Sequence, residues 1–564
     1  MIRRTLLALA VVAGVAVFAL LPPRTLPISG ANPPPPILRG AMHVHTTNSD
    51  GSGTPDAVAA AAARAGLKFV ILTDHGDATR TPDRPQYRSG VLTIDAVEVS
   101  TSGGHVIALD LPKAPYPLRG DPDDVLEDLQ RLGAMAIVAH PTSLKADLVW
   151  RGSDGSGGRP FDGVEWLNGD SEWRDERFWS LSRILLTYWF RAPESLALIL
   201  DRPDSALALW DRAARTHSVV GLSGSDAHAK IGGDLDHGGP AAVHLPSYEQ
   251  VFRTFSLGVP EVVLSGNAPA DARAVIAAIR AGHVFTAIDA FAQPARLAFT
   301  ASGSGVRAQA GDRVAVGVQL ALHAEVDAPD LAPTLTLYRD GSAAATATGS
   351  RLDYQTDGTP GVYRVEATLP VRRGGGPLAP WLVSNPIYVG PPVAWTPLAP
   401  PPSVASKVVY KDGASPLAVE HSERSDGAVS VVRAEGGGTQ LSLRFALGGK
   451  LSDAPFVAFA SAAPDIGGYA AVTFSGRASR PMRISVQLRA SAEQGSGRWR
   501  KSVYLDETSR TVTLPFSEFR PTGNGLPAMP RLDSIMSLLF VLDTLNTALG
   551  SNGEFLIDSL AFVR

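Results

Sequence analysis

The spacing of apolar residues divides the chain into segments of different texture. From about residue 38 to residue 293, short apolar runs alternate with Ala- and Leu-rich stretches of helical spacing. This alternation is typical of an α/β domain built on parallel strands. We expect four of the strands at residues 68–72, 134–138, 163–167 and 218–222. Helices are predicted over 55–65 and 122–132, because each stretch begins at a proline that follows Thr54 or Asp121.

The rest of the chain alternates apolar and polar residues over short runs. Between residues 294 and 390 this pattern indicates an all-β domain. Residues 391–403 are predicted to be a linker, because six prolines fall between positions 391 and 402. Alternating runs with glycine-rich turns return over residues 404–564 and predict a β-sandwich. The fold class expected is therefore multidomain, α/β followed by all-β.

The first residues have the pattern of a secretory signal. Arg3 and Arg4 precede an apolar stretch over residues 5–21. We therefore expect an exported protein, periplasmic or extracellular. The 17 residues of this stretch are at the short limit of a bilayer span, so an uncleaved membrane anchor is the alternative. Pro33 to Pro36 predict a stiff spacer, so that residues 1–37 precede the first domain.

The amino-acid composition excludes some partners and some kinds of metal site. The 564 residues are 45% hydrophobic and 19% charged, as in ordinary folded proteins. A net charge of -4 gives no basic surface of the kind that nucleic acid requires, so we exclude nucleic acid as a main partner. The chain has no cysteine, which excludes disulfides, thiolate metal sites and a cysteine nucleophile. Any metal must therefore be held by nitrogen and oxygen ligands.

Histidines and carboxylates collect at the predicted strand ends. His43 and His45 are separated by one residue, so that on a strand both imidazoles face the same side and one metal ion can contact both. The other candidate ligands are Asp50, His75, Glu98, His105, His140, Asp226 and His228. All nine except His105 lie at or just past the C-terminal end of a strand, where parallel barrels assemble their active sites. Six of the 12 histidines in the chain belong to this set.

Other polar residues are expected around the ligands. We predict that Asp74 orients a ligating imidazole rather than binding metal itself. Glu165 and Asn168 end another strand, where they could contact substrate or cap the following segment. Lys145, Arg151 and Lys230 are candidates to bind phosphate, with solvated surface charge as the alternative. The tryptophan-rich segment 171–216 is predicted to be helices packed on the barrel, with a lid or a membrane-facing patch as alternatives.

At these positions the sequence resembles the polymerase and histidinol phosphatase (PHP) superfamily of metalloesterases. The four motifs of the family are matched in order by His43-Val-His45 with Asp50, by Thr73-Asp74-His75, by His140, and by Asp226-Ala-His228. Glu98 corresponds to the bridging carboxylate, and His105 to an added ligand. The resemblance covers about residues 38–290 and implies a distorted seven-stranded β/α barrel that holds two or three divalent metal ions.

The resemblance also implies how the ligands are shared. A first metal would be held by His43, His45, Glu98 and Asp226, a second by Glu98, His105 and His140, and a third by Asp50, His75 and His228. The spacing from Glu98 to His105 and the segment 281–286 are similar to an exported branch that includes carbamate hydrolases. Residues 294–390, on the strength of segments 361–366 and 384–388, resemble an immunoglobulin-like module. Residues 404–564, with Trp499, Phe516 and Phe519, resemble galactose-binding-like jelly rolls.

The expected function is metal-dependent hydrolysis of a phosphate ester. A hydroxide shared by the metal ions and held in part by Glu98 would attack phosphorus, with His75 or His228 donating a proton to the leaving group. Imidazole and carboxylate ligands suit zinc, manganese and iron alike. One alternative is an amide or carbamate hydrolase that uses the same metal site. Another is an envelope protein that binds glycans through its C-terminal domain and whose metal site is structural.

Overall fold

The structure is a computed structural model that divides into two compact units. It describes residues 14, 17–28, 37–154, 158–230, 243–303, 305–314, 319–328, 330–370, 379–391, 406–434, 436–463, 465–491, 497–523 and 525–564. Residues 1–77, 81–112 and 126–395 form the first unit, and residues 78–80, 113–125 and 396–564 form the second. The proline spacer at 33–36, nearly all of the linker at 391–403 and most of the apolar stretch at 5–21 lie outside the described residues.

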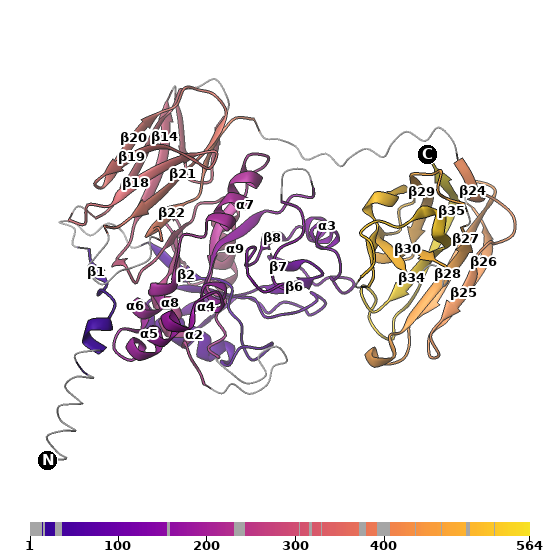
Figure 1. Ribbon diagram of the computed structural model, residues 1–564, viewed down its shortest axis with the longest axis horizontal. Coiled ribbons are helices and arrows are strands. Elements are labelled where there is room, and N and C mark those ends of the chain that lie inside the picture. The colour runs from indigo at the N-terminus through magenta and orange to yellow at the C-terminus, as the bar shows by residue number, and fades with distance from the viewer. Residues whose placement is uncertain are drawn as a thin grey trace, which may run out of the picture. The chain divides into compact units, whose positions relative to one another are not determined.

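Strands between residues 38 and 224 of the first unit follow one another in a ring, of which Figure 1 labels β2, β6, β7 and β8. In pairing order they are β2 (Leu38–Ala41), β3 (Phe69–Leu72), β5 (Val91–Asp95), its continuation β6 (Val97–Thr101), β7 (Gly104–Leu109), β8 (Met135–Val138), β9 (Gly163–Asn168) and β10 (Val220–Gly224). Isolated bridges between His75 and Glu98 and between Val44 and Ala227 connect the two sheets involved. The second bridge leads from the end of β10 back to the end of β2, so the ends of distant strands meet.

The strand pairing is mixed, whereas parallel strands are predicted from the sequence. β7 runs antiparallel to both β6 and β8, and β11 (Ser256–Val259) runs antiparallel to β2. The four expected strands and both expected helices are present, since β3, β8, β9 and β10 lie within or beside the predicted runs. The reversed direction of β7 explains the position of His105, because the start of an antiparallel strand lies at the same rim as the ends of its neighbours.

Helices cover the outside of this ring. They are α2 (Pro55–Arg64), α3 (Pro122–Leu132), α4 (Gly169–Arg174), α5 (Phe178–Tyr188), α6 (Ala192–Leu196), α7 (Asp204–Ala214), α8 (Tyr248–Thr254) and α9 (Ala268–Arg280). The Thr54 hydroxyl accepts a hydrogen bond from Ala57 N at 3.2 Å, and Pro55 opens α2, which confirms the predicted helix start. Within the described ranges, no helix combines the length and the apolar character needed to cross a bilayer.

A β-sandwich continues directly from the ring. One of its layers is β15 (Val306–Gln309), β14 (Leu297–Gly303), β17 (Ala321–Val326) and β20 (Arg351–Gln355). The other contains β16 (Arg313–Val314), β23 (Ile387–Val389), β21 (Gly361–Thr368), β22 (Leu382–Ser384), β18 (Thr334–Arg339) and β19 (Ser342–Thr348). β22 pairs with β12 (Phe285–Ala287), which pairs with β11, and β11 pairs with β2 of the ring. One sheet therefore passes from the sandwich into the ring.

Buried polar contacts reinforce this junction. The Tyr388 hydroxyl donates to Val219 O at 3.0 Å and accepts from Val219 N at 2.8 Å. The Arg202 guanidinium makes two hydrogen bonds of 2.8 Å to the Glu366 carboxylate, which is 2% exposed. Arg364, also 2% exposed, makes ion pairs with Glu366 and with Asp211 of α7. Such paired charges are tolerated in the interior because each has its counter-ion.

The second unit is a sandwich of two antiparallel sheets. One contains β26 (Asp426–Arg433), β27 (Thr439–Ala446), β35 (Asn552–Val563), β29 (Ala471–Ala478), β32 (Arg510–Pro515) and β24 (Ser406–Tyr410). The other contains β25 (Ala418–His421), β28 (Phe456–Ala462), β34 (Ile535–Asp543), β30 (Met482–Ala490), β31 (Arg498–Leu505) and β33 (Arg520–Pro521). Aromatic side chains from both sheets, including Phe459, Phe474 and Phe540, fill the space between them. The β-sandwich predicted for this segment is confirmed.

Candidate metal centre

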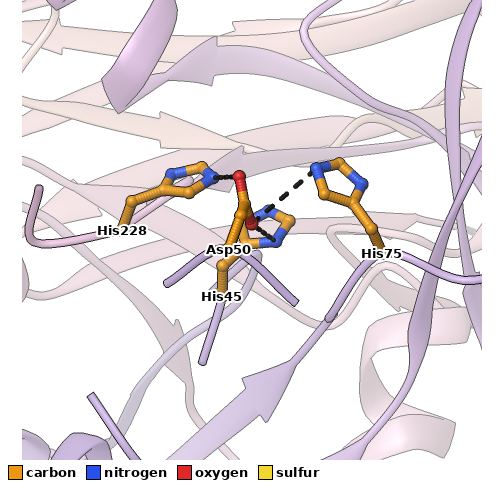
Figure 2. A group of neighbouring side chains, drawn as sticks. All are labelled: His45, Asp50, His75 and His228. Carbon is orange, nitrogen blue, oxygen red and sulfur yellow. Dashed lines mark ion pairs between the residues drawn. The ribbon is translucent and has the colours of Figure 1, made fainter. Parts of the chain in front are cut away.

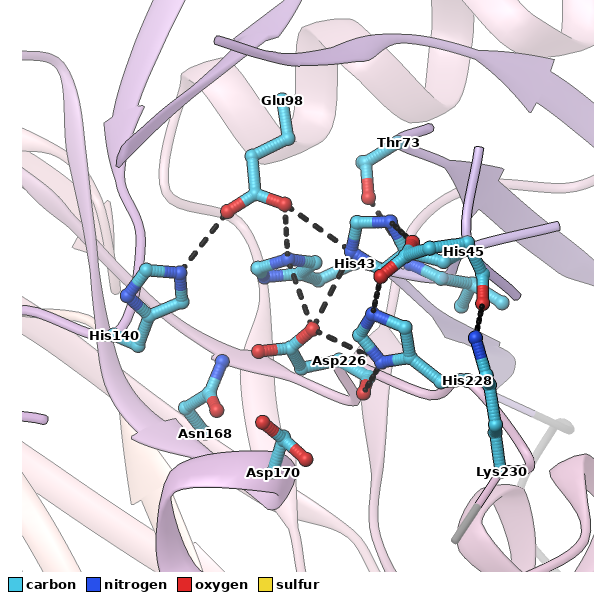
Figure 3. Close-up of polar contacts among 12 residues, drawn as sticks. His43, His45, Thr73, Glu98, His140, Asn168, Asp170, Asp226, His228 and Lys230 are labelled. Atoms are coloured by element: carbon cyan, nitrogen blue, oxygen red, sulfur yellow. Dashed lines mark hydrogen bonds and ion pairs between the residues drawn. The ribbon is translucent and has the colours of Figure 1, made fainter. Parts of the chain in front are cut away.

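All nine residues predicted as metal ligands lie at one rim of the ring, around Glu98. The Oε1 atom of Glu98 lies 2.8 Å from Nδ1 of His105 and 3.0 Å from Nε2 of His140. Its Oε2 atom lies 3.1 Å from Nε2 of both His43 and His45, and 3.3 Å from Nδ1 of His75. Glu98 is 1% exposed, so five imidazoles from four segments converge on one buried carboxylate. Figure 3 shows three of them, His43, His45 and His140, around Glu98.

Asp226 approaches the same pair of histidines from the end of β10. Its Oδ1 atom lies 3.3 Å from Nε2 of His43 and 3.3 Å from Nε2 of His45. His43 and His45 are fully buried, and their ring centroids are 5.2 Å apart. The two imidazoles therefore present their Nε2 atoms to two carboxylates at once. They face the same side as predicted, but not through strand alternation, since β2 ends at Ala41 and His43 has a φ of +59°.

A second group of ligand atoms surrounds Asp50 (Figure 2). Its Oδ2 atom lies 3.1 Å from Nε2 of His228, and its Oδ1 atom lies 3.4 Å from Nδ1 of His45. His75 is farther away, with Nε2 at 4.0 Å from Oδ1. His45 and His75 thus lie between this group and Glu98, because their other ring nitrogens face the Glu98 carboxylate.

Three of these residues have an unfavourable backbone conformation. The φ angles of His43, His140 and Asp226 are +59°, +30° and +45°. Residues with a side chain avoid this left-handed region, and each such residue costs of order 1–3 kcal/mol, typically tolerated where function requires it. The positive φ values turn the side chains into the rim directly after their strands end. The surrounding fold must supply the free energy that holds them there.

Glu165 holds one of the imidazoles in place. Its Oε1 atom lies 2.7 Å from Nδ1 of His43, while its Oε2 atom accepts hydrogen bonds from His140 N at 2.9 Å and from Asn168 Nδ2 at 2.8 Å. Gly224 provides the space, because a Cβ there would lie 1.8 Å from Glu165 Oε1. Of the two roles predicted for this strand end, Asn168 has the capping one, since its side chain accepts from Ser171 N at the start of α4.

Asp74 has a different role from the one predicted. Its carboxylate accepts hydrogen bonds from Thr46 N at 2.7 Å, from the Thr46 hydroxyl at 2.8 Å and from the Ser49 hydroxyl at 2.7 Å. Asp74 contacts no imidazole of the described residues directly; it reaches one only through the Ser49 hydroxyl, which lies 3.4 Å from Nδ1 of His45, and its bonds fix the loop that carries Asp50. The direct contact with an imidazole is made by Glu165. Which carboxylate faces a ring nitrogen depends on the packing of distant segments, which spacing along the chain does not reveal.

Three imidazoles are anchored through Nδ1 and present Nε2 to the rim. Nδ1 of His43 bonds to Glu165, that of His140 donates to Leu148 O at 3.2 Å, and that of His228 donates to Asp226 O at 2.9 Å. In metal sites the second ring nitrogen of a ligating histidine is bonded in this way, which fixes the tautomer with a free Nε2 lone pair. The arrangement therefore suits metal ligation at Nε2.

The charges in this network depend strongly on one another. Burial would raise the pKa of Glu98, but the imidazoles of His43, His105 and His75 outweigh it and hold that pKa well below its usual range. Burial lowers the pKa of His45, yet the carboxylates of Asp226 and Glu98 raise it to about 10. The pKa of His75 is lowered, because burial outweighs the attraction of Glu98. The carboxylates are thus anionic at neutral pH and require positive charge beside them.

The donor set fits divalent metal ions. Ligand atoms lie within 4.8 Å of one another in four overlapping groups, which are His45, Asp50, His75 and His228; His43, Glu98 and His140; His43, His45 and Asp226; and His75, Glu98 and His105. The buried Nε2 atom of His45 makes no hydrogen bond, although two carboxylate oxygens lie within 3.3 Å. An imidazole nitrogen left in this state is suited to a cation. The groups overlap the ligand sets implied by the resemblance, with His45 added to the Asp50 group.

The basic residues of the rim differ in their positions. The Lys230 ammonium lies 3.4 Å from Asp50 O, beside the candidate ligands. Arg151 donates to Ala146 O at 2.7 Å, and Lys145 lies 3.8 Å from Asp147, so both contact their own surface loop. Lys230 is therefore the basic residue, of the three predicted, that lies against the site.

A small apolar cavity of about 60 Å³ adjoins Asp226 and His228. Its walls include Trp173, Leu196, Ile199, Leu200 and Phe255, with the Asp170 carboxyl group near the ligands. Burial and the nearby Asp226 raise the pKa of Asp170, which is paired with Arg174. Asp170 is not among the site residues predicted from the sequence. Its place two residues after Asn168, just past the end of β9, is the signal that could have indicated it.

Comparison with other proteins gives partial likenesses among solved structures. No family model matches the sequence, and no curated protein matches it. Among solved structures, the family 11 carbohydrate-binding module of the cellulosomal cellulase Lic26A-Cel5E of Clostridium thermocellum is 17% identical, with a TM-score of 0.24, over 29% of this chain and 96% of that one. The family 30 module of the cellulase Cel9D-Cel44B of the same organism is 11% identical, with a TM-score of 0.21, over 28% and 98%. Similarities of this size do not identify a function.

Proposed function

We propose that the chain is a metal-dependent hydrolase of the PHP type that cleaves a phosphate ester. The observation that carries this proposal is the convergence of five imidazoles on the two oxygens of Glu98, with Asp226 and Asp50 on either side. Structural metal sites are usually closed by four ligands, whereas here nine candidate ligands from separate segments share one rim. In this proposal the ring of strands is the distorted β/α barrel of that superfamily, and the site holds two or three zinc, manganese or iron ions.

The ligands would be divided around Glu98. His43, His45 and Asp226 would hold one ion, Glu98 with His105 and His140 a second, and Asp50, His75 and His228 a third. Adjacent divalent ions supply hydroxide at neutral pH and neutralise the charge that develops on phosphoryl oxygens. Glu165 keeps the His43 ring in the orientation that this requires, through its 2.7 Å contact with Nδ1.

The chain's own residues would bind the ester and move its proton. Lys230 lies where its ammonium can contact a phosphoryl oxygen. His75 has the most solvent-exposed imidazole of the group, with 35% of its side chain accessible, and its pKa is lowered mainly by burial. Its accessibility would let it donate a proton to a leaving oxygen in a state where it is not bound to a metal ion, with His228 as the second candidate under the same condition. The apolar cavity beside His228 would take the organic part of the ester.

The test uses the purified full-length chain loaded with Mn²⁺ or Zn²⁺. We expect turnover of p-nitrophenyl phosphate or bis(p-nitrophenyl) phosphate that the double variant His43→Ala/His45→Ala loses. His323→Ala and His421→Ala are matched controls, because both histidines lie in β-sandwiches on strands β17 and β25, and both should retain activity. Faster cleavage of a p-nitrophenyl carbamate than of either phosphate would favour the alternative amide or carbamate hydrolase.

The glycan-binding alternative remains a prediction for the C-terminal sandwich. It would replace the hydrolase proposal if the metal-loaded chain cleaved none of these substrates and the double histidine variant still bound polysaccharide as well as the parent chain. Binding to soluble β-glucans, followed by affinity electrophoresis, measures this directly.

A further inference from the structure

Helix α5 is apolar on two opposite sides. Ile184, Thr187 and Tyr188 face inward and are buried. Its outward side and the turn after it expose large apolar side chains, which are Phe178, Trp179, Leu185, Leu186, Trp189 and Phe190, at 73, 80, 48, 52, 75 and 66%. These six side chains form what we call the α5 patch. A surface helix of a soluble domain normally exposes polar residues on this side, so the patch requires a partner.

The tryptophans make the patch unusual within this protein. Trp179 and Trp189 are the exposed tryptophans of the described residues, whereas Trp150, Trp166, Trp210, Trp381 and Trp499 are buried. Trp179 packs edge-on against Phe178 at 5.5 Å, and Trp189 against Tyr188 at 5.9 Å. Tryptophan prefers the boundary between water and hydrocarbon, because its ring is apolar and its N–H is polar.

The chain that follows the apolar N-terminal stretch is bound beside this patch. Arg183 of α5 donates to Leu20 O at 3.0 Å, and Arg191 donates to Pro22 O. Thr25 contacts the Glu194 carboxylate at 3.1 Å, and β1 (Leu26–Pro27) pairs with β13 (Ala292–Gln293). Figure 1 shows this N-terminal segment next to α5 and α6. The apolar sequence 5–21 therefore joins the folded unit beside α5.

The charges around the patch are suited to an anionic surface. α5 contains Arg183 and no acidic residue, and Arg177 immediately before it is exposed, whereas the carboxylates of Asp175 and Glu176 lie before Arg177 in the chain. An open groove of about 800 Å³ next to the patch is lined by Arg24, Trp189, Phe190 and Arg191, with Glu194 held by Thr25. Arginines beside aromatic side chains are the usual means by which a protein contacts lipid phosphates at a bilayer surface.

We propose that the α5 patch docks on an anionic lipid bilayer, with Trp179 and Trp189 inserted at the level of the headgroups. The exit of the apolar N-terminal sequence beside α5 favours this partner, because that sequence and the patch would then meet the same membrane. A second copy of the chain is disfavoured as the partner, since stable protein interfaces bury roughly 1,200–2,000 Å² and one short helix supplies only a small part of that area. A bilayer needs no complementary shape.

The absence of cysteine makes a direct test possible. Leu186→Cys carries an environment-sensitive NBD fluorophore in the full-length chain, and Val263→Cys, 89% exposed in the connection between β11 and α9 of the same unit, is the matched control. Vesicles of phosphatidylcholine and phosphatidylglycerol should raise NBD emission at position 186 several-fold. Brominated acyl chains should then quench it. At position 263 we expect no change in either measurement.

Two results would overturn the proposal. In the first, NBD at position 186 remains as accessible to aqueous iodide as at position 263 when the chain is bound to vesicles. In the second, emission at position 186 rises with protein concentration without lipid, which would identify a second copy as the partner. Adding Trp179→Ser and Trp189→Ser to the Leu186→Cys chain should abolish the lipid-dependent rise, while near-ultraviolet circular dichroism checks the fold. None of these measurements involves catalysis, so the outcome is independent of the proposed hydrolase function.

Discussion

The Oε1 atom of Glu165 lies 2.7 Å from Nδ1 of His43, and both side chains are completely shielded from solvent. Substituting Glu165 would disturb more than the contact with His43, because its Oε2 atom accepts hydrogen bonds from His140 N and from the Asn168 side chain. The pair connects β9 with the end of β2 and sets the direction in which His43 presents Nε2. Its importance can be measured through metal affinity.

Glu165→Gln should weaken metal binding by roughly 10- to 100-fold, the usual loss when a carboxylate behind a ligating histidine is removed. The amide nitrogen must face either the His43 ring or the two N–H donors at Oε2, so one contact becomes unfavourable. Metal content after dialysis against graded chelator measures the affinity. Glu172→Gln, a nearby carboxyl group that accepts from Asp201 N, is the control. Equal metal retention in both variants would refute the orienting role.

Gly224→Ala should reproduce the effect of Glu165→Gln without altering either partner. The added methyl group would meet Glu165 Oε1 at 1.8 Å and displace the carboxylate. We expect the metal affinity of this variant to fall at least as far. Gly436→Ala has open space around the new methyl group and is the matched control. Unchanged metal content in Gly224→Ala would show that Glu165 does not need its observed position.

Removal of metal should destabilise the first unit. A ligand that binds only the folded state stabilises it by about 2.7 kcal/mol when present at 100 times its Kd, which corresponds to a shift in Tm on the order of 3 °C for a unit of this size. EDTA should therefore lower the Tm of the parent chain. Glu98→Ala should melt at the same temperature with and without EDTA. Scanning calorimetry separates the transitions of the two units, and an EDTA-insensitive parent chain would contradict metal binding.

Glu366→Ala should destabilise the junction strongly. It leaves Arg364, 2% exposed, without one of its carboxylate partners, and breaking such a buried pair costs about 3–5 kcal/mol. Glu420→Ala removes a similar two-bonded contact with Arg489, at 2.8 and 2.9 Å, from a position where the Glu420 side chain is 37% exposed. The free energy of unfolding of Glu420→Ala should fall by no more than about 1 kcal/mol. Urea unfolding measures this free energy for both variants, and equal decreases would contradict the argument that burial makes the Glu366 pair the more costly one to break.

Glu172 should make stability depend on pH. Burial raises its pKa from 4.5 to about 7, so between these values the folded state binds more protons than the unfolded state. Its contribution to stability is therefore fully present below pH 4.5 and is lost as pH rises towards 7. The stability of Glu172→Gln relative to the parent chain should therefore increase by on the order of 1–2 kcal/mol as the pH rises from 5 to 8. A constant difference in Tm across this range would contradict the raised pKa.

The candidate ligands could be predicted because they follow apolar runs that become strands. His43 and His45 come just after β2, which ends at Ala41, so their common direction comes from the chain beyond the strand, where His43 has a φ of +59°, and not from strand alternation. Asp226 follows the apolar run that becomes β10. These side chains lie close together because the ends of neighbouring strands lie at the same rim. His105 shows the limit of this reasoning, because its place at the rim depends on the antiparallel direction of β7. Apolar runs do not record strand direction.

The supporting contacts could not be predicted in the same way. The contact of the Glu165 carboxylate with the His43 imidazole arises from packing between segments that are 122 residues apart in the sequence. Likewise, the composition of α5 reveals an apolar helix but not that two of its sides are apolar in the folded chain. The pairing of β22 with β12 was also not predicted, since alternation shows which side of a strand is buried and not which strand lies beside it.

That pairing limits how freely this chain could be divided during evolution. A gene cut after residue 293 would encode a protein whose β12 strand lacks the neighbour seen at Leu382–Ser384. Its unpaired N–H and C=O groups would offer a template for self-association. Replacement of the sandwich by another domain would thus succeed only if the new domain supplied a strand that pairs with β12.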